Sequence, residues 1–420
     1  MKKTFYIFFL LVMIACYTPA KAILVTIPDA NFRAKLQTLY PACFVGAQME
    51  TTCKAITTAT TLEVGNLKIA DLSGIEYFIS LQNLDCSYNK LSSLPSLSIS
   101  LRSLSCQYNQ LASLPNLPAS LQNLFCGNNK LITLPILPAS LQNLHCESNQ
   151  LMSLPTLPAS LRQLSCGLNQ LTNLPNLPIS LQHLLCAYNK LTNLPTLSAN
   201  LQNLNCGANQ LANLPLLPTG LQELSCGENQ LVILPTLPIG LQNLYCGANQ
   251  LTNLSAIPIN LQILHCGNNK LKDLPKLPSN LQGLYCGENQ LINLPTLPPT
   301  LQNLNCHSNM LDFADLEIIT LNFSDYYALL QSHKISRDSQ LLTKNATLTI
   351  NGTIGGSQNV YQWYKNNVLI PGAKSAIYIK KNTTSTDAGV YRCEVTSTYV
   401  GAGTTKGVII KSNEVRVSYK

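Results

Sequence analysis

The sequence predicts a mainly β fold, in which a long solenoid of short parallel strands is followed by a smaller β-sandwich. The first observation behind this prediction is a motif that returns every 20 residues, twelve times in register, from Leu81 onward. The second is the leucine at its fixed positions, and the third is a change near residue 341 to short segments of alternating character. With 420 residues, the chain is also too long for one ordinary compact domain. We expect five parts in order: a signal peptide (1–22), an N-terminal cap (23–58), a solenoid of one 22-residue and twelve 20-residue repeats (59–311), a C-terminal cap with linker (312–340) and a sandwich (341–420).

The first 22 residues have the pattern of an export signal. Lys2 and Lys3 form the positively charged start, and residues 5–17 form the apolar stretch. Ala20-Lys21-Ala22 fits the small-x-small pattern of a cleavage site. Because the apolar stretch is too short to span a bilayer, we expect cleavage near Ala22 and a secreted or cell-surface protein.

A second interpretation of the leader stays open. Met13-Ile14-Ala15-Cys16 resembles a lipoprotein processing box, which would leave Cys16 lipidated. We expect the protein to meet a membrane only in that case. No later segment is long and apolar enough for a transmembrane helix.

The charge pattern argues against nucleic acid as a partner. The chain has 27 Lys+Arg and 19 Asp+Glu, and removing the three leader lysines leaves 24 against 19. The charges are scattered, without a basic cluster or interleaved aromatic residues. Charged residues make up only 11% of the chain and hydrophobic residues 46%, which is too apolar for a disordered protein.

The repeat follows the consensus Leu-x-x-Leu-x-Cys-x-x-Asn-x-Leu-x-x-Leu-Pro-x-Leu-Pro-x-x, for example from Leu121 to Ser140. Leucine at position 4 and cysteine at position 6 alternate with variable residues, which predicts a short strand with both side chains inward. Asparagine at position 9, as in Asn89 and Asn109, is expected to bond backbone groups that the turn leaves unpaired.

The second half of each repeat predicts the return side of the coil. Leucines at positions 11, 14 and 17 should fill the rest of the core. Prolines at positions 15 and 18 exclude a helix and a paired central strand, so the convex side should be extended. Because one repeat cannot bury its own apolar side, the repeats must stack, with a parallel sheet on the concave face.

The repeat resembles the leucine-rich repeat, and its Leu-Pro-x-Leu-Pro tail resembles the short 20-residue type of secreted bacterial effectors. The resemblance covers Leu81 to about Leu311. The chain departs from that type in having cysteine where valine or leucine usually stands. Some of those effectors carry a C-terminal ubiquitin-ligase domain, and nothing after residue 311 resembles it.

The N-terminal cap should cover the first turn of the solenoid, since an open coil exposes its core. Pro28-Asp29 is expected to open an amphipathic helix with Phe32, Leu36 and Leu39 on one face. The segment that begins at Ile27 resembles the N-terminal caps of leucine-rich-repeat proteins of the Bacteroidetes group. At the other end, the segment that follows the last repeat has lost the period and should close the coil.

The 16 cysteines fall into groups. Twelve stand at position 6, from Cys86 to Cys306. In-register parallel strands lie about 4.8 Å apart, whereas a disulfide needs its Cβ atoms at about 3.8 Å. We therefore expect buried thiols that act as small hydrophobic groups, and no metal site, because they face leucines without His or carboxylate neighbours. Cys43 and Cys53, in the loop-rich cap, are expected to form a disulfide.

Two motifs mark the C-terminal domain. Trp363 lies in Val-Tyr-Gln-Trp-Tyr-Lys, and Asp-Ala-Gly-Val-Tyr-Arg-Cys ends at Cys393. They resemble the strand C tryptophan and the strand F Asp-x-Gly-x-Tyr-x-Cys of immunoglobulin-like domains. The resemblance implies that Trp363 packs between the sheets and that Tyr391 is the tyrosine-corner residue. Ile350 stands in the slot of the strand B cysteine, so Cys393 should form no bridge.

The outward positions of the strands are the candidates for ligand contact, because leucine-rich-repeat proteins usually bind with the concave sheet. Tyr245, His265 and Tyr285 stand at position 5 of three successive repeats and should form an aromatic row about 10 Å long. The glycines two residues later would leave a shallow trough beside the rings. Rings beside bare backbone suit a protein hot spot or a sugar-stacking platform. Further candidates at positions 5 and 8 are Phe125, His145, Tyr88, Tyr108 and Tyr188.

An alternative interpretation of this surface needs no ligand. Tyrosine is favoured on strands by propensity alone. Glycine at position 7 would then simply suit the turn after the cysteine.

The sequence contains no recognisable catalytic set, so we expect no enzyme and no cofactor. His145 and His265 would be six strands apart, about 29 Å. General acid–base partners must lie within hydrogen-bond reach. We also find no phosphate loop or nucleophile elbow.

These features predict an extracellular or cell-surface adhesion protein that recognises a protein or glycan through the concave repeat surface. One alternative is a self-assembling structural component of the cell envelope. Another is a secreted effector directed at host cells. The sequence does not determine the ligand or the oligomeric state.

Overall fold

The computed structural model describes residues 23–311, 331–333, 339–351, 359–397, 409–412 and 414–420. The predicted signal peptide, the alternative lipidation at Cys16 and most of the predicted C-terminal cap lie outside the described residues. The chain divides into two compact units, the first ending at Leu171 and the second beginning at Thr172. Among the helices that the described ranges contain, none has the length and apolar character needed to cross a membrane.

The N-terminal cap combines a helix with a small sheet. Helix α2 (Ala30–Leu39) begins at Asp29, whose Oδ1 accepts from the amides of Asn31 and Phe32 at 2.9 Å. Asp29 Oδ2 also accepts from the amide of Ala70 at 2.8 Å, which ties the helix to the first turn of the coil. The cap also contains β1 (Leu24–Thr26), η1 (Pro41–Cys43), β2 (Phe44–Val45), β3 (Gln48–Glu50) and α3 (Lys54–Thr57), and its antiparallel strand order is β1-β3-β2.

Helix α2 has the amphipathic character that the sequence predicts, but its last residue is not buried. Phe32 and Leu36 are fully buried, but Leu39 is 42% exposed. Leu39 is exposed because it is the last residue of the helix, where the chain turns into η1. Cys43 at the end of η1 and Cys53 are joined by a disulfide, with their Cα atoms 5.6 Å apart.

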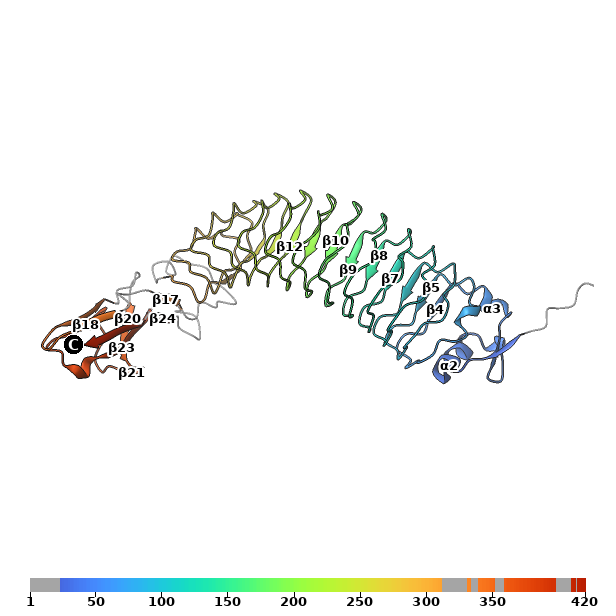
Figure 1. Ribbon diagram of the computed structural model, residues 1–420, viewed down its shortest axis with the longest axis horizontal. Helices are drawn as coiled ribbons and strands as arrows, with labels where there is room; N and C mark the ends of the chain where they lie inside the picture. The colour runs from blue at the N-terminus through green and yellow to red at the C-terminus, as the bar shows by residue number, and fades with distance from the viewer. Residues whose placement is uncertain (1–22, 312–330, 334–338, 352–358, 398–408, 413) are drawn as a thin grey trace, which may run out of the picture. The chain divides into compact units, whose positions relative to one another are not determined.

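Short parallel strands recur through the first unit, one in each repeat. Neighbours pair in register, so that Leu84 faces Leu104 and Leu104 faces Leu124. In Figure 1 these strands lie side by side, coloured from blue to green. They are β4 (Thr61–Glu63), β5 (Asn83–Asp85), β6 (Ser103–Ser105), β7 (Asn123–Phe125), β8 (Asn143–His145) and β9 (Gln163–Ser165); the turn after β4 also contains η2 (Ile75–Tyr77).

The repeats of the second unit have the same construction. Each strand again covers positions 3 to 5 and pairs in register with the next, as Leu244 does with Leu264. The strands are β10 (His183–Leu185), β11 (Asn203–Asn205), β12 (Glu223–Ser225), β13 (Asn243–Tyr245), β14 (Ile263–His265), β15 (Gly283–Tyr285) and β16 (Asn303–Asn305). The predicted parallel-sheet solenoid of about twelve turns is confirmed.

The core of each turn follows the repeat. Leucine at positions 1, 4 and 11 and cysteine at position 6 are almost fully buried, as Leu121, Leu124, Cys126 and Leu131 are. Position 17 is less regular, because some of its leucines are buried and others are partly exposed. Positions 11 to 18 form neither helix nor strand in the described repeats, as the two prolines require.

Asparagine at position 9 holds neighbouring turns together. Asn229 Nδ2 donates to the carbonyls of Cys206, Cys226 and Gly227, each at 3.1 Å. Its Oδ1 accepts from the amide of Leu211 at 3.0 Å. Asn89 and Asn109 make equivalent bonds. One side chain therefore satisfies backbone groups of two repeats where the strand ends.

The C-terminal domain is a mainly antiparallel β region with the features of an immunoglobulin-like domain, in which the pairs β17–β24 and β18–β25 are parallel. One sheet has the order β17-β24-β23-β20-β21, with β25 pairing β23 and β18; a second pairs β19 with β22. The elements are β17 (Gln331–His333), β18 (Ser339–Leu342), β19 (Leu348–Asn351), β20 (Asn359–Lys365), β21 (Val368–Leu369), β22 (Ile377–Lys380), η3 (Ser385–Asp387), β23 (Gly389–Ser397), β24 (Ile409–Ser412) and β25 (Val415–Tyr419). Strand pairing thus begins ahead of residue 341, where the sequence analysis placed the start of this domain.

The core of this domain forms without a disulfide. Trp363 is fully buried, pairs with Cys393 across β20 and β23, and donates from Nε1 to the carbonyl of Ser375 at 2.8 Å. The Tyr391 hydroxyl donates to the carbonyl of Asp387 at 2.7 Å, the geometry of a tyrosine corner. Ile350 is fully buried where a bridging cysteine would stand, and Cys393 is a buried thiol.

Candidate ligand-binding surface

The strands present one face of side chains to the outside. Position 4 is buried in every described strand of the solenoid, so positions 3 and 5 on either side of it project from the opposite face. We call this the strand face. Variable residues at positions 5, 7 and 8 lie along it and differ from one repeat to the next.

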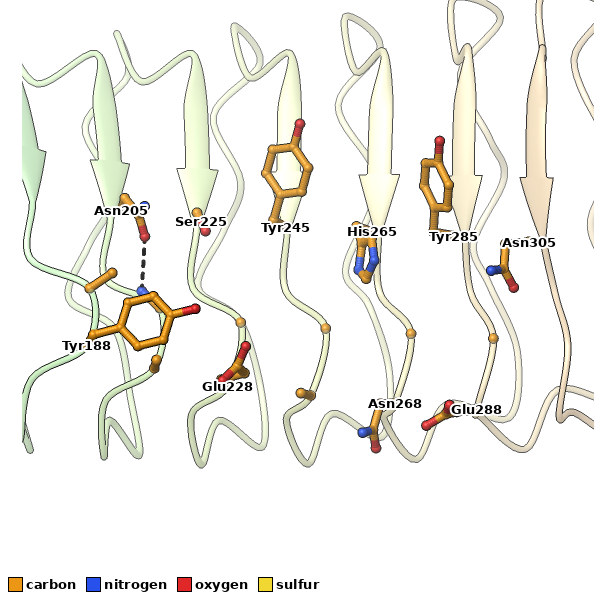
Figure 2. A pocket seen from close by; sticks show the side chains of 18 of the residues that line it. Tyr188, Asn205, Ser225, Glu228, Tyr245, His265, Asn268, Tyr285, Glu288 and Asn305 are labelled. Carbon is orange, nitrogen blue, oxygen red and sulfur yellow. Dashed lines mark hydrogen bonds between the residues drawn. The ribbon is translucent and has the colours of Figure 1, made fainter. Parts of the chain in front are cut away.

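A hollow of about 460 Å³ lies on the strand face of the second unit, which we call the strand-face hollow. Tyr245, His265 and Tyr285 line it from three successive strands, as Figure 2 shows. The ring centroids of Tyr245 and His265 are 6.4 Å apart, and those of His265 and Tyr285 are 5.5 Å apart with their planes 20° from parallel. The structure therefore brings these three predicted residues together as a row of rings, with Tyr188 lining the same hollow.

Glycine lines the hollow at position 7 of five successive repeats, from Gly207 to Gly287. None of these glycines has the left-handed backbone that favours glycine. That conformation occurs instead at position 8, where φ is 55° at Glu228 and 52° at Ala248. A left-handed backbone therefore does not explain why glycine stands at position 7, as the interpretation in which glycine suits the turn would require.

Packing limits position 7 unequally, since a Cβ atom at Gly247 would come within 2.9 Å of His265 Nδ1 and one at Gly287 within 2.8 Å of the His307 ring. A Cβ atom at Gly227 would come within 3.0 Å of the carbonyl of Gly247, and one at Gly267 within 3.1 Å of that of Gly287. Ala187 and His307 occupy position 7 at the two ends of the hollow, so the repeat tolerates a side chain there. The run of glycines leaves open space beside the rings.

Acidic residues flank the hollow. Glu228 and Glu288 stand at position 8, on the opposite side of the glycines from the rings (Figure 2). The residues that line the hollow include no lysine or arginine. Burial raises the pKa of the Tyr245 hydroxyl, and the nearby Glu223 carboxylate and Tyr285 raise it further, so this phenol stays protonated at neutral pH.

The remaining predicted contact residues form pairs in the first unit. The rings of Tyr88 and Tyr108 stack, with centroids 4.3 Å apart and planes within 10° of parallel. The ring centroids of Phe125 and His145 lie 5.0 Å apart. Phe125 also borders a smaller hollow of about 180 Å³, to which Asp85 contributes.

Sequence reasoning missed several residues of the strand-face hollow. Asn205 and Asn305 stand at position 5 at its two ends, and Ser225 lies between Asn205 and the first ring (Figure 2). The two glutamates at position 8 were also not singled out. The signal was present, since positions 5 and 8 are both variable and lie on either side of the glycine at position 7.

The cysteines at position 6, which we call the cysteine ladder, lie in the leucine core of the solenoid. The cysteines at position 6 are buried thiols, fully or almost fully shielded from solvent. Burial raises the pKa of the Cys106, Cys206 and Cys246 thiols to about 12. The described residues contain no group of three or more His, Cys, Asp or Glu side chains able to hold a metal ion.

Solved structures place the repeats among known proteins. YopM from Yersinia enterocolitica is 32% identical over 66% of this chain and 69% of its own, with a TM-score of 0.50. YopM from Yersinia pestis, described as a leucine-rich effector protein, is 31% identical over 60% of this chain and 84% of its own, with a TM-score of 0.54. The chain belongs to the bacterial leucine-rich-repeat proteins.

Further comparisons extend the likeness of this leucine-rich-repeat protein beyond its repeats. The functional domain of InlJ from Listeria monocytogenes, which includes a cysteine ladder, shares its fold over 96% of this chain and 100% of that one, at 19% identity and a TM-score of 0.63. The family model of the immunoglobulin domain matches residues 332–418. No curated protein matches the chain by sequence. The likeness to N-terminal caps of the Bacteroidetes group stays a prediction.

Proposed function

We propose that this leucine-rich-repeat protein is a non-catalytic binding protein that acts outside the cell and recognises a protein or glycan through its strand face. The observation that carries the proposal is the row of Tyr245, His265 and Tyr285 beside open glycine backbone. A few residues carry most of the binding energy of a recognition surface, and tyrosine is among the types enriched there. His265 lies between the two tyrosines, stacked with the ring of Tyr285 and tilted by 36° to that of Tyr245, an arrangement that supports contact with a ligand.

The proposed location rests on the leader and on the cysteines. The export signal predicted for residues 1–22 would carry the chain out of the cytoplasm, either free or anchored at Cys16. The Cys43–Cys53 disulfide is consistent with an oxidising compartment.

A second candidate function is that of an effector that acts inside a host cell. The identity with YopM, which is described as an effector protein, favours it. The Cys43–Cys53 disulfide suits a reducing cytosol poorly, so we rank this function second.

The proposal is tested with the variant Tyr245→Ala/Tyr285→Ala. The wild-type protein is screened on a combined glycan and protein array, and the hits are titrated against the variant. We expect affinity to fall about tenfold or more because two ring contacts are lost. The melting temperature should not change, since both side chains lie outside the core.

The matched control is Ile136→Ala/Ile179→Ala, which removes two exposed apolar side chains outside the strands. Affinity should stay at the wild-type value in this variant. Equal affinity in wild type and in the tyrosine variant would show that the aromatic row is not the binding site.

A further inference from the structure

A row of backbone amides lies along the strand-face hollow, at position 7 of successive repeats. The amide of Gly207 donates to Asn205 Oδ1 at 3.3 Å, and that of His307 donates to Asn305 Oδ1 at 3.4 Å. Because side chains at position 5 project from the strand face, these bonds show that position 7 amides point to that face (Figure 2). The repeats between Gly207 and His307 share the same backbone hydrogen bonding. In each of them, the position 8 amide donates to the position 7 carbonyl of the next repeat.

The amides between these two ends have no acceptor within the described part of the chain. There, position 5 holds serine, tyrosine or histidine in place of asparagine. The carbonyl of each glycine is bonded, as that of Gly247 is to the Glu228 amide at 2.9 Å and to Asn249 Nδ2 at 3.2 Å. The four amides concerned belong to Gly227, Gly247, Gly267 and Gly287.

An amide without an acceptor is costly where solvent is restricted. Gly247 and Gly287 are buried residues, whereas Gly227 and Gly267 are partly exposed. The position 7 amide of Gly127 in the first unit likewise has no acceptor within the described residues, so water or a ligand supplies the partner that such amides need. Four such donors in succession, open to the hollow because glycine carries no side chain, form a regular array.

We propose that this array, together with the aromatic row, binds a neutral linear polysaccharide that runs across the strands with one sugar residue over each repeat. This inference rests on the proposed function and names its ligand class. Each amide would donate to a hydroxyl or ring oxygen, while the rings of Tyr245, His265 and Tyr285 would cover the apolar faces of the sugars.

The spacing of the array favours a sugar polymer over a peptide. Adjacent strands, and therefore adjacent amides, lie about 4.8 Å apart. This is close to the advance of an extended 1,4-linked pyranose chain per residue, and each pyranose carries oxygen atoms along both edges. Carbonyls on one edge of an extended peptide recur only every second residue, at about 6.6 Å, so a peptide along the row would lose register within two repeats.

The charges of the hollow favour a neutral polymer over an acidic one. Glu228 and Glu288 line the hollow, and the lining residues contain no lysine or arginine to offset them. A uronic acid or sulfated sugar would be repelled. Neutral sugar hydroxyls can instead donate to these carboxylates while they accept from the amides.

The test uses the full-length protein and calorimetric titration with cellohexaose and chitohexaose. Hexagalacturonate serves as the acidic comparison, and disaccharides serve as the short comparison. We expect a neutral hexamer to bind and the matching disaccharide to bind about tenfold more weakly, because it spans too few repeats. The acidic hexamer should not bind.

The variant Ser225→Asn tests the amides without removing a ring. It copies the natural arrangement at Asn205, so the new side chain should accept the bond from the amide of Gly227 and withdraw that donor from the ligand. We expect affinity for the hexamer to fall about fivefold, the effect of one hydrogen bond. The control is Ser165→Asn, which makes the same change ahead of Gly167 in the first unit and should leave affinity unchanged.

The outcomes separate this inference from the proposed function. Failure of both neutral hexamers to bind, tighter binding of the acidic hexamer, or a Ser225→Asn variant with wild-type affinity would overturn the polysaccharide assignment. If a protein ligand from the array still loses affinity in Tyr245→Ala/Tyr285→Ala, the proposed function stands and the ligand is a protein. If no ligand depends on the two tyrosines, both proposals fail.

Discussion

Position 8 of the repeat shows how much a single residue must adapt to this coil. All twelve residues at this position have a left-handed backbone, with φ of 54° at Leu168 and 49° at Ala208, and none is glycine. An L-residue other than asparagine or aspartate pays about 1 kcal/mol or more in this conformation. The conformation persists because the position 9 asparagine bonds to neighbouring turns, as Asn169 does beside Leu168, and because the position 8 amide bonds to the next turn in ten of the twelve repeats.

This strain predicts the effect of substitutions at Leu168, whose side chain is exposed. Leu168→Asn should raise the free energy of unfolding by about 0.5 kcal/mol, because asparagine tolerates the left-handed region. Leu168→Val should lower it by about 1 kcal/mol, because a β-branched side chain clashes there. Urea unfolding followed by circular dichroism measures both changes.

The control for this prediction is exposed Met152, whose φ is not positive. Met152→Asn and Met152→Val should each change the free energy of unfolding by less than about 0.5 kcal/mol. A Leu168→Val variant as stable as the wild type would contradict the account of strain at position 8.

At the scale of the structural element, the strand and the turn after it work as one unit. The cysteine at position 6 directly follows the strand, and its side chain is buried. Its carbonyl accepts a hydrogen bond from the asparagine at position 9, as Cys126 does from Asn129 Nδ2 at 3.1 Å. The thiol itself lies in the leucine core. Each turn thus buries one ionisable thiol, next to the thiols of the neighbouring turns.

The ladder predicts that the protein loses stability in alkaline solution. Burial raises the pKa of the Cys106, Cys206 and Cys246 thiols from 9.0 to about 12. Below pH 9 these thiols stay protonated in the folded and the unfolded chain alike, so they do not lower the free energy of unfolding. Between pH 9 and 12 the unfolded chain releases protons that the folded chain retains, and the free energy of unfolding falls as pH rises.

The measurement is the urea concentration at the midpoint of unfolding, taken at pH 8, 9.5 and 11. Lysine and tyrosine also titrate in this range, so the comparison is with Cys106→Val/Cys206→Val/Cys246→Val. The midpoint of this variant should fall less steeply with pH than that of the wild type. Equal slopes would show that the ladder thiols do not govern the alkaline loss.

At the scale of the whole molecule, stability is distributed along the chain. Each repeat contacts its neighbours, so a local change acts mainly on adjacent turns. The N-terminal cap has a disulfide, and the immunoglobulin-like domain has Ile350 and a buried Cys393 thiol in place of one. A reducing agent therefore has one target among the described residues.

Reduction should destabilise the cap and spare the C-terminal domain. Opening the Cys43–Cys53 bond, which joins residues 10 apart in sequence, should cost about 2–3 kcal/mol locally. We expect faster amide hydrogen exchange in α2 and β3 and unchanged exchange in β20 and β23. Mass spectrometry with and without reductant measures this difference.

The variant Cys43→Ser/Cys53→Ser is the control for reduction. Its exchange should already be fast in the cap and should not respond to reductant. Faster exchange in β20 or β23 of the reduced wild type would contradict the prediction, because it would require a second reducible bond.

The sequence by itself determined the solenoid and the immunoglobulin-like domain, because both depend on patterns that lie along the chain. The 20-residue period sets which side chains face inward, and the prolines exclude helices on the return side. The tryptophan and the tyrosine-corner motif mark the second fold in the same way. It also placed Tyr245, His265 and Tyr285 in one row, since strict repetition converts sequence spacing into spatial spacing.

Only the tertiary structure decided what surrounds that row. The left-handed backbone at position 8, the direction of the position 7 amides and the bonds of Asn205 and Asn305 to two of them depend on how one turn lies against the next. The exposure of Leu39 depends on where its helix ends. A repeat pattern specifies which residues are equivalent, but hydrogen bonding between turns determines which donors are already used and which remain for a ligand.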